Sequence, residues 1–90
     1  MASSSRILPL AEKATLSAGS NNATTVSNAT VVRVLATSGN VVVFRTDSSN
    51  AIIGSFTLLS NTSELVEKNP TDKLYVTGSN VEVAKVGFTG

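Results

Sequence analysis

The sequence predicts an all-β protein: a single small antiparallel β-sandwich or barrel of about six or seven short strands, preceded by an extended N-terminal arm. Valine and threonine, which fit a pleated surface best, supply 12 and 11 of the 90 residues and occur in short runs. Clusters of Ser, Asn, Gly and Asp separate these runs at intervals of about 8 to 12 residues, which is typical of sandwiches and barrels. The spacing serves either architecture, so the choice between them stays open.

The predicted strands follow the apolar runs in chain order, at 23–27, 30–36, 40–46, 51–59, 63–67, 73–77 and 81–88. The clearest local pattern is a hairpin between the second and third of them, because Gly39 and Asn40 both tolerate positive φ at the reversal. The returning strand is apolar on both faces, with Val43 on one and Phe44 on the other. This pattern predicts a closed barrel wall or a sheet covered on both sides, and a neighbouring subunit is one candidate cover.

Two irregularities and one turn are predicted within the strand region. Gly54 in mid-strand predicts a bulge or a close approach of another backbone. The apolar set changes face between Val83 and Ala84, which predicts a second bulge near Ala84. The segment from Asp47 to Asn50 resembles a fragment of a calcium loop, but it lacks the glycine and the distal glutamate of that pattern, so a turn is favoured.

Residues 1–20 predict an extended arm, and residues 21–90 make up the predicted β domain. Pro9 interrupts the only helical candidate, at 8–16, so extended structure is favoured there. The arm carries large aliphatic side chains, and we predict that these contact a partner protein. The predicted partner-binding residues are Ile7, Leu8, Leu10 and Leu16.

The composition excludes most reactive chemistry. Because there is no Cys and no His, the chain has no thiolate and no imidazole, either as a nucleophile or base or as a metal ligand. No catalytic residue, metal site or cofactor is therefore predicted, and the protein is not expected to be an enzyme. The formal net charge of +1 gives no strong field for a nucleic-acid partner. No apolar run approaches the roughly 18 to 20 residues of a membrane helix, so no membrane partner is expected either.

Small domains usually need a further stabilising device, since a chain of this length buries only about 60 to 65% of the surface that it exposes when unfolded. Disulfides are excluded, and three Phe and one Tyr are the only aromatic residues available for a core. Assembly is the device that remains. We therefore expect burial against another protein or against further copies of the chain as a homo-oligomer.

Four segments carry a likeness to a known group of proteins: Val31–Val34, Gly54–Leu58, Glu67–Asp72 and Val86–Thr89. Around them, residues 24–90 resemble small β-rich virion structural proteins of tailed bacteriophages that infect marine cyanobacteria. The resemblance implies a capsid decoration (cement) protein, located on the capsid surface of the virion and bound to the major capsid protein or to other virion proteins. It implies no catalytic residues and no cofactor.

The alternative function is a tail, fibre or spike module of the virion that binds a host-surface glycan. Such sites commonly stack sugars on an exposed Trp or Tyr, and Tyr75 is the one candidate in this sequence. For the decoration function, a sheet edge is a candidate contact in addition to the arm. An edge strand can extend a neighbour's sheet by main-chain hydrogen bonds.

Overall fold

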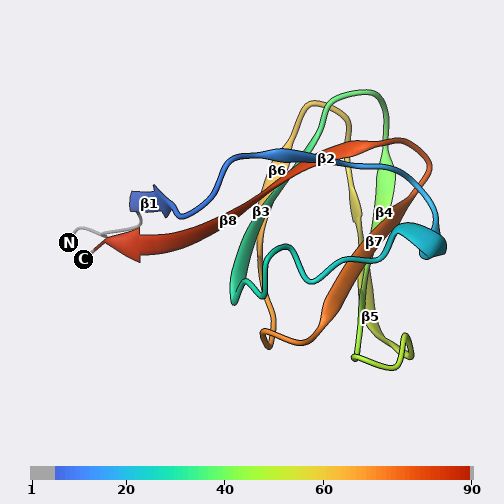
Figure 1. The fold of residues 1–90 in the computed structure, drawn as a ribbon. Helices are drawn as coiled ribbons and strands as arrows, with labels where there is room; N and C mark the ends of the chain where they lie inside the picture. Colours follow the sequence, from blue (N-terminus) through green and yellow to red (C-terminus); the bar gives the residue numbers. More distant parts are fainter. Residues whose placement is uncertain (1–5, 90) are drawn as a thin grey trace.

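A computed structural model of the protein describes residues 6–89, which are all-β apart from one 3₁₀ turn, η1 (Ser20–Asn22). Two antiparallel sheets pack face to face as a small sandwich, which confirms the predicted fold class (Figure 1). The first sheet contains β1 (Arg6–Pro9), β2 (Ala14–Leu16), β8 (Val81–Thr89), β3 (Val31–Ala36) and β6 (Ser63–Glu67). The second sheet contains β5 (Ile52–Leu58), β4 (Val41–Thr46) and β7 (Lys73–Thr77), with β4 in the centre.

The predicted hairpin between residues 30–36 and 40–46 is wrong, because β3 and β4 belong to different sheets. β3 pairs with β6 and β8, whereas β4 pairs with β5 and β7. The connection through Gly39, whose φ is 151°, carries the chain from one sheet to the other. Two strands that each have an apolar face can pair edge to edge or face each other across a core. The alternating sequence pattern is the same in both cases.

The core lies between the sheets and is made mostly of valines. Along β3 buried and half-buried residues alternate, so that Val32, Val34 and Ala36 point inward. Val43 of β4 and Leu74 of β7 belong to the same buried cluster and approach it from the second sheet. The period of two in the sequence therefore identifies the inner face correctly, although it does not identify the partner strand.

The strand predicted at 23–27 is wrong. Only Thr24 makes an isolated bridge there, to β7. The chain then turns through three successive residues with positive φ: Val26 at 53°, Ser27 at 56° and Asn28 at 57°. The β-propensity of the segment is overridden because the chain must reverse here, from the edge of the second sheet toward β3 in the first.

The bulge predicted beside Gly54 is confirmed. Gly54 lies opposite Arg45 and Ile52 lies opposite Thr46, so Ile53 is the extra residue on β5. A Cβ atom on Gly54 would meet nothing within 4 Å, so the glycine accompanies the bulge and no other backbone approaches it closely.

The bulge predicted near Ala84 is wrong, because β8 pairs with β3 in one continuous register from residue 81 to residue 85. The irregularity lies instead in the N-terminal segment that pairs with β8, between β1 and β2. Pro9 is opposite Val86 and Ala14 is opposite Val83, so residues 10–13 span only two residues of β8. The change of apolar face along β8 therefore reflects a change of neighbour.

Residues 6–9 and 14–16 of the predicted arm are extended and form part of the first sheet, since β1 and β2 both pair with β8; residues 1–5 of that arm lie outside the described part of the chain. Residues 17–24 then cross to the second sheet. There the Gly19 N–H donates to the Val76 carbonyl at 2.8 Å, and Thr24 and Leu74 exchange main-chain hydrogen bonds of 3.0 and 2.8 Å. We call this the closed side of the sandwich. On the opposite, open side, β5 and β6 are the outermost strands within residues 6–89.

Candidate functional site

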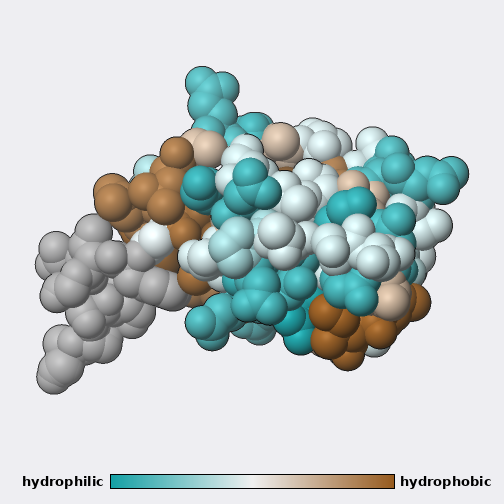
Figure 2. All heavy atoms as spheres, turned by 60° about the horizontal axis from the view of Figure 1, so that its bottom comes forward, coloured by the Kyte–Doolittle hydropathy of each residue, from teal (hydrophilic) through white to brown (hydrophobic). Residues whose placement is uncertain are grey.

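A two-stranded ribbon of β1, Leu10 and the end of β8 is the most prominent surface feature. It projects beyond the packed sheets in Figure 1, and an apolar area lies at the same end of the molecule in Figure 2. Ile7, Leu8 and Leu10 are 38%, 46% and 51% exposed, and we call these three residues the ribbon patch. Successive side chains of a strand point to opposite faces, so Leu8 and Leu10 share one face of the ribbon and Ile7 lies on the other. Exposed large aliphatic side chains grouped on one projecting element are typical of a surface that contacts another molecule.

Leu16, the fourth predicted partner-binding residue, is placed differently. Its side chain is 5% exposed and belongs to the buried cluster between the sheets. It cannot contact a partner while the domain is folded, so the prediction for Leu16 is corrected to a core role. The physical reason is its position at the end of β2, where Leu16 lies opposite Val81 of β8 and the arm enters the sandwich.

Pro9 limits how the ribbon can bind. Leu10 donates its N–H to the Lys85 carbonyl on β8 at 2.9 Å, so the preceding nitrogen, that of Pro9, is directed to the free edge of β1. A proline nitrogen has no hydrogen to donate, and prolines at free edges oppose strand addition. We therefore expect the ribbon to use its side chains for contact and not to extend a sheet.

A second apolar area lies at the β5 bulge. Ile52 and Ile53 are adjacent and are 58% and 48% exposed, because the bulge leaves neither of them in the core. We call this pair the bulge patch; Figure 2 shows an apolar area on the side of the molecule away from the ribbon. The sequence prediction missed this patch, although the Gly54 signal for a bulge adjoins it.

The sheet edges that the sequence suggested for binding are β5 and β6, on the open side. A cleft of about 150 Å³ lies between them, lined mainly by Phe56, Val66 and core residues, with Glu67 and Arg45 also contributing. The cleft is narrow and largely apolar. It is thus a gap between the two sheets, with one carboxylate and one guanidinium among its lining groups.

A larger hollow of about 320 Å³ lies between the arm, residues 22–27 and β8. Its lining combines hydroxyl and aliphatic side chains with two charged groups, Glu12 and Lys85. One carboxylate and one ammonium line the hollow, so it offers no concentrated charge of either sign to an ionic ligand.

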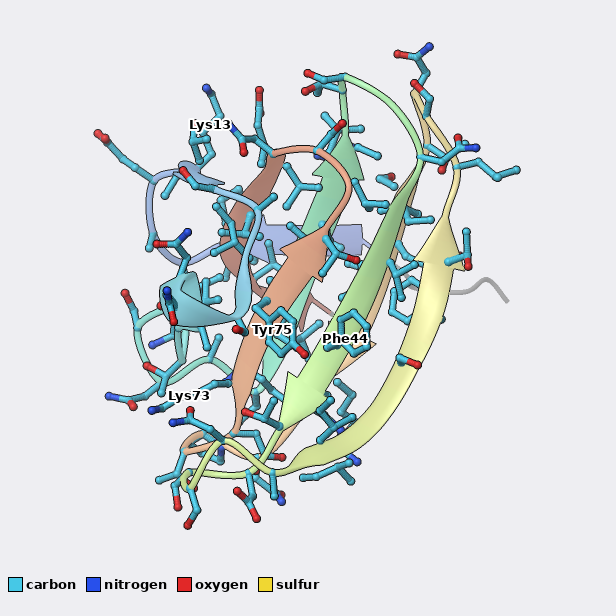
Figure 3. The ribbon with its side chains drawn as sticks, turned by 90° about the vertical axis from the view of Figure 1, so that its right-hand side faces the viewer. Lys13, Phe44, Lys73 and Tyr75 are labelled. Atoms are coloured by element: carbon cyan, nitrogen blue, oxygen red, sulfur yellow. The ribbon has the colours of Figure 1, made fainter. Side chains whose placement is uncertain are left out.

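Tyr75 does not form an exposed platform for a sugar. The ring stacks on Phe44, its register partner on β4, with centroids 4.7 Å apart and planes 11° from parallel (Figure 3). Phe44 thus covers one face of the ring, and the residue is only 9% exposed. The aromatic residue on which the glycan alternative depends is therefore engaged within the protein.

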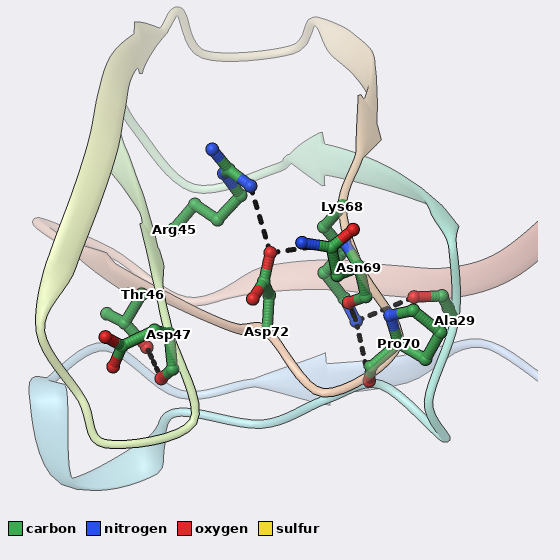
Figure 4. Close-up of polar contacts among 8 residues, drawn as sticks. All are labelled: Ala29, Arg45, Thr46, Asp47, Lys68, Asn69, Pro70 and Asp72. Atoms are coloured by element: carbon green, nitrogen blue, oxygen red, sulfur yellow. Dashed lines mark hydrogen bonds and ion pairs between the residues drawn. The ribbon is translucent and has the colours of Figure 1, made fainter.

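Buried charges join the loops at one end of the sandwich (Figure 4). Lys68 donates from its Nζ to the Ala29 carbonyl at 2.7 Å and to the Asn69 carbonyl at 3.3 Å. Asp72 accepts from Arg45 at 2.9 Å and from the Asn69 N–H at 3.2 Å. Burial lowers the pKa of Lys68; the nearby Asp72 acts in the opposite direction. These bonds satisfy the polar groups, and they are structural.

The predicted turn at Asp47–Asn50 is confirmed. Asp47 Oδ1 accepts the N–H groups of Ser49 at 2.8 Å and of Ala51 at 3.0 Å, which folds the segment around its own carboxylate. Between residues 6 and 89 no group of three or more His, Cys, Asp or Glu side chains is placed to hold a metal ion. Within the same range, no helix is long and apolar enough to cross a membrane.

Comparison of the chain with protein-family models, with curated proteins and with solved structures found no match. The residues and their arrangement are thus the basis for assigning a function. What they offer is contact surface: the ribbon patch, the bulge patch and the open edges of β5 and β6.

Proposed function

We propose that this protein is a structural component of a virion, a capsid decoration (cement) protein that binds the capsid lattice through its ribbon patch. The observation that carries the proposal is the ribbon, which projects beyond the packed sheets (Figure 1). Its residues Ile7, Leu8 and Leu10 are exposed. The resemblance of residues 24–90 to phage virion proteins supplies the class of partner.

The mechanism is stabilisation by binding. A protein that binds the assembled lattice, and not its separated subunits, shifts the equilibrium toward the assembled state in proportion to its affinity and concentration. The ribbon suits this task, because β1 pairs with β8 in the first sheet while its aliphatic side chains face solvent. Burial of such side chains contributes about 25 cal/mol for each Å² removed from water.

Cosedimentation with expanded, undecorated capsids of a tailed cyanobacterial phage tests the proposal. The wild-type chain is expected in the capsid pellet. The triple variant Ile7→Ser/Leu8→Ser/Leu10→Ser should bind roughly tenfold more weakly or worse, since three partly buried aliphatic contacts are lost.

The matched control is Ile52→Ser/Ile53→Ser, which removes a comparably exposed aliphatic pair from the bulge patch. It should sediment with capsids as the wild type does, and far-UV circular dichroism should show that both variants keep the β-fold. A wild-type protein that stays in the supernatant, or a ribbon variant that binds as tightly as the control, contradicts the proposal. An elongated trimer that ignores capsids and binds glycans would favour the alternative virion role.

A further inference from the structure

The ribbon carries exposed apolar side chains on both of its faces. In β1, Ile7 and Pro9 point to one face and Leu8 points to the other, because side chains alternate along a strand. The Leu10 N–H continues the pairing with β8, which puts Leu10 on the face of Leu8. All four residues are exposed, so each face offers two of them to a partner.

The end of the ribbon has two strands only. β8 pairs with β3 as far as Lys85, and from Val86 to Thr89 its one partner strand within residues 6–89 is β1. This part projects beyond the packed sheets (Figure 1). On the leucine face it is also thin, because Gly87 lies opposite Leu8 and has no side chain; a Cβ atom there would lie 3.4 Å from Leu10 Cδ1.

This shape favours a cleft over a flat binding surface. A flat surface can bury only one face of the ribbon and leaves two apolar residues of the other face in water. Burial of both faces requires a wall on each side. Since residues 7–10 have no charged or hydrogen-bonding side chain, both walls must be apolar. Pro9 opposes strand addition at the free edge of β1, so the faces and not the edge make the contact.

We infer that the ribbon inserts as a wedge into an apolar cleft between two neighbouring copies of the capsid protein, with Ile7 against one copy and the two leucines against the other. This inference rests on the function proposed above and specifies the site on the lattice. A cement protein must bind the assembled lattice more tightly than a separate subunit. A cleft with walls from two subunits exists only after assembly, whereas a surface within one subunit is present before it.

Variants of one face at a time test the wedge, by cosedimentation with expanded, undecorated capsids of a tailed cyanobacterial phage. Ile7→Ser and Leu8→Ser/Leu10→Ser should each weaken binding about fivefold, because each face loses contact with its own wall. The control is Ile53→Ser, which changes an exposed isoleucine of the bulge patch and should bind as the wild type does. Far-UV circular dichroism should show the same β-fold in all of these variants.

Photocrosslinking counts the subunits that the ribbon touches. With a diazirine amino acid in place of both Ile7 and Leu10, irradiation of decorated capsids should join one chain to two capsid-protein chains. Replacement of either residue alone should give one-to-one products only, which are resolved by denaturing gel electrophoresis.

Two results overturn the wedge while the proposed function stands. In the first, the wild type binds capsids but one of the single-face variants binds as tightly as Ile53→Ser. In the second, each single replacement crosslinks but the doubly replaced chain never joins two capsid-protein chains. A wild-type chain that stays in the supernatant contradicts the proposed function itself, and the wedge with it.

Discussion

The closed and open sides of the sandwich protect their sheet edges in different ways. On the closed side, residues 17–24 cross from β2, which pairs with β8, to the edge of β7. There Gly19 and Thr24 form main-chain hydrogen bonds with Val76 and Leu74. On the open side β5 and β6 are joined by residues 59–62, and no other strand within the described part of the chain lies beyond them. Since the protein has no disulfide to close either side, the comparison shows that its own N-terminal segment supplies one closure and leaves the other edge available.

Leucines on the two sides should differ most in their contribution to stability. Leu74, on the strand that the closed side covers, is fully buried, and Leu74→Ala should reduce the free energy of unfolding by about 3 kcal/mol. Leu65 on β6 is exposed, so Leu65→Ala should cost less than about 1 kcal/mol. Urea unfolding of the three proteins measures both values, and equal losses would contradict the difference in burial between β7 and the open-edge strand β6.

Lys68 should give the next largest effect, because it joins the loop before β7 to the carbonyl of Ala29. Lys68→Met leaves that buried carbonyl without its donor and should lower the free energy of unfolding by about 2 kcal/mol. Lys73→Met is the matched control, since its ammonium makes an exposed bond to Asn50 at 3.2 Å, and it should change stability by less than about 0.5 kcal/mol. Thermal unfolding of the two variants compares them directly; a greater loss in Lys73→Met would refute the assignment.

The smallest expected effect is a dependence of stability on pH. Burial lowers the pKa of folded Lys68, with Asp72 opposing and Lys85 adding to the shift, so the folded protein releases this proton at lower pH than the unfolded chain does. The unfolded state then binds more protons, and the free energy of unfolding should rise as the pH increases toward the ordinary pKa of lysine. Urea unfolding at about pH 8 and pH 10 should show this rise in the wild type relative to Lys68→Met. A fall would contradict the burial of the charge.

Local sequence patterns predicted faces and turns better than they predicted neighbours. The alternation of Val32, Val34 and Ala36 gave the inner face of β3, and the turn at Asp47 was correct, because both depend on residues close in sequence. The predicted pairing of β3 with β4 was wrong. The alternation of apolar residues along a strand does not show whether the next strand in the chain pairs beside it or packs across the core. The left-handed turn at Val26 was missed because the prediction followed the β-propensity of the segment. The turn is held both by local bonds, from the Ala29 N–H to the carbonyls of Thr25 and Val26, and by Lys68 and Lys85 from far along the chain.

The residues of the candidate site likewise include some that the sequence predicted correctly and others whose placement depends on strand pairing. Ile7, Leu8 and Leu10 were predicted from an aliphatic arm without a periodic pattern, and the structure leaves their side chains exposed. Leu16 belongs to the same arm, but its pairing with the start of β8 carries it into the core. The bulge patch was missed because exposure of Ile52 and its neighbour depends on the register of β5 against β4.

By itself the sequence determined the all-β class, the absence of thiol and imidazole chemistry, and a stability that depends on valine-rich faces. These follow from composition and from a period of two, which are properties of single segments. Only the tertiary structure decided which strands share a sheet, which of the arm's four aliphatic residues stay exposed, and where the chain closes one side of the sandwich. Those outcomes depend on contacts between residues far apart in the chain, whose energies exceed the local preferences that a sequence displays.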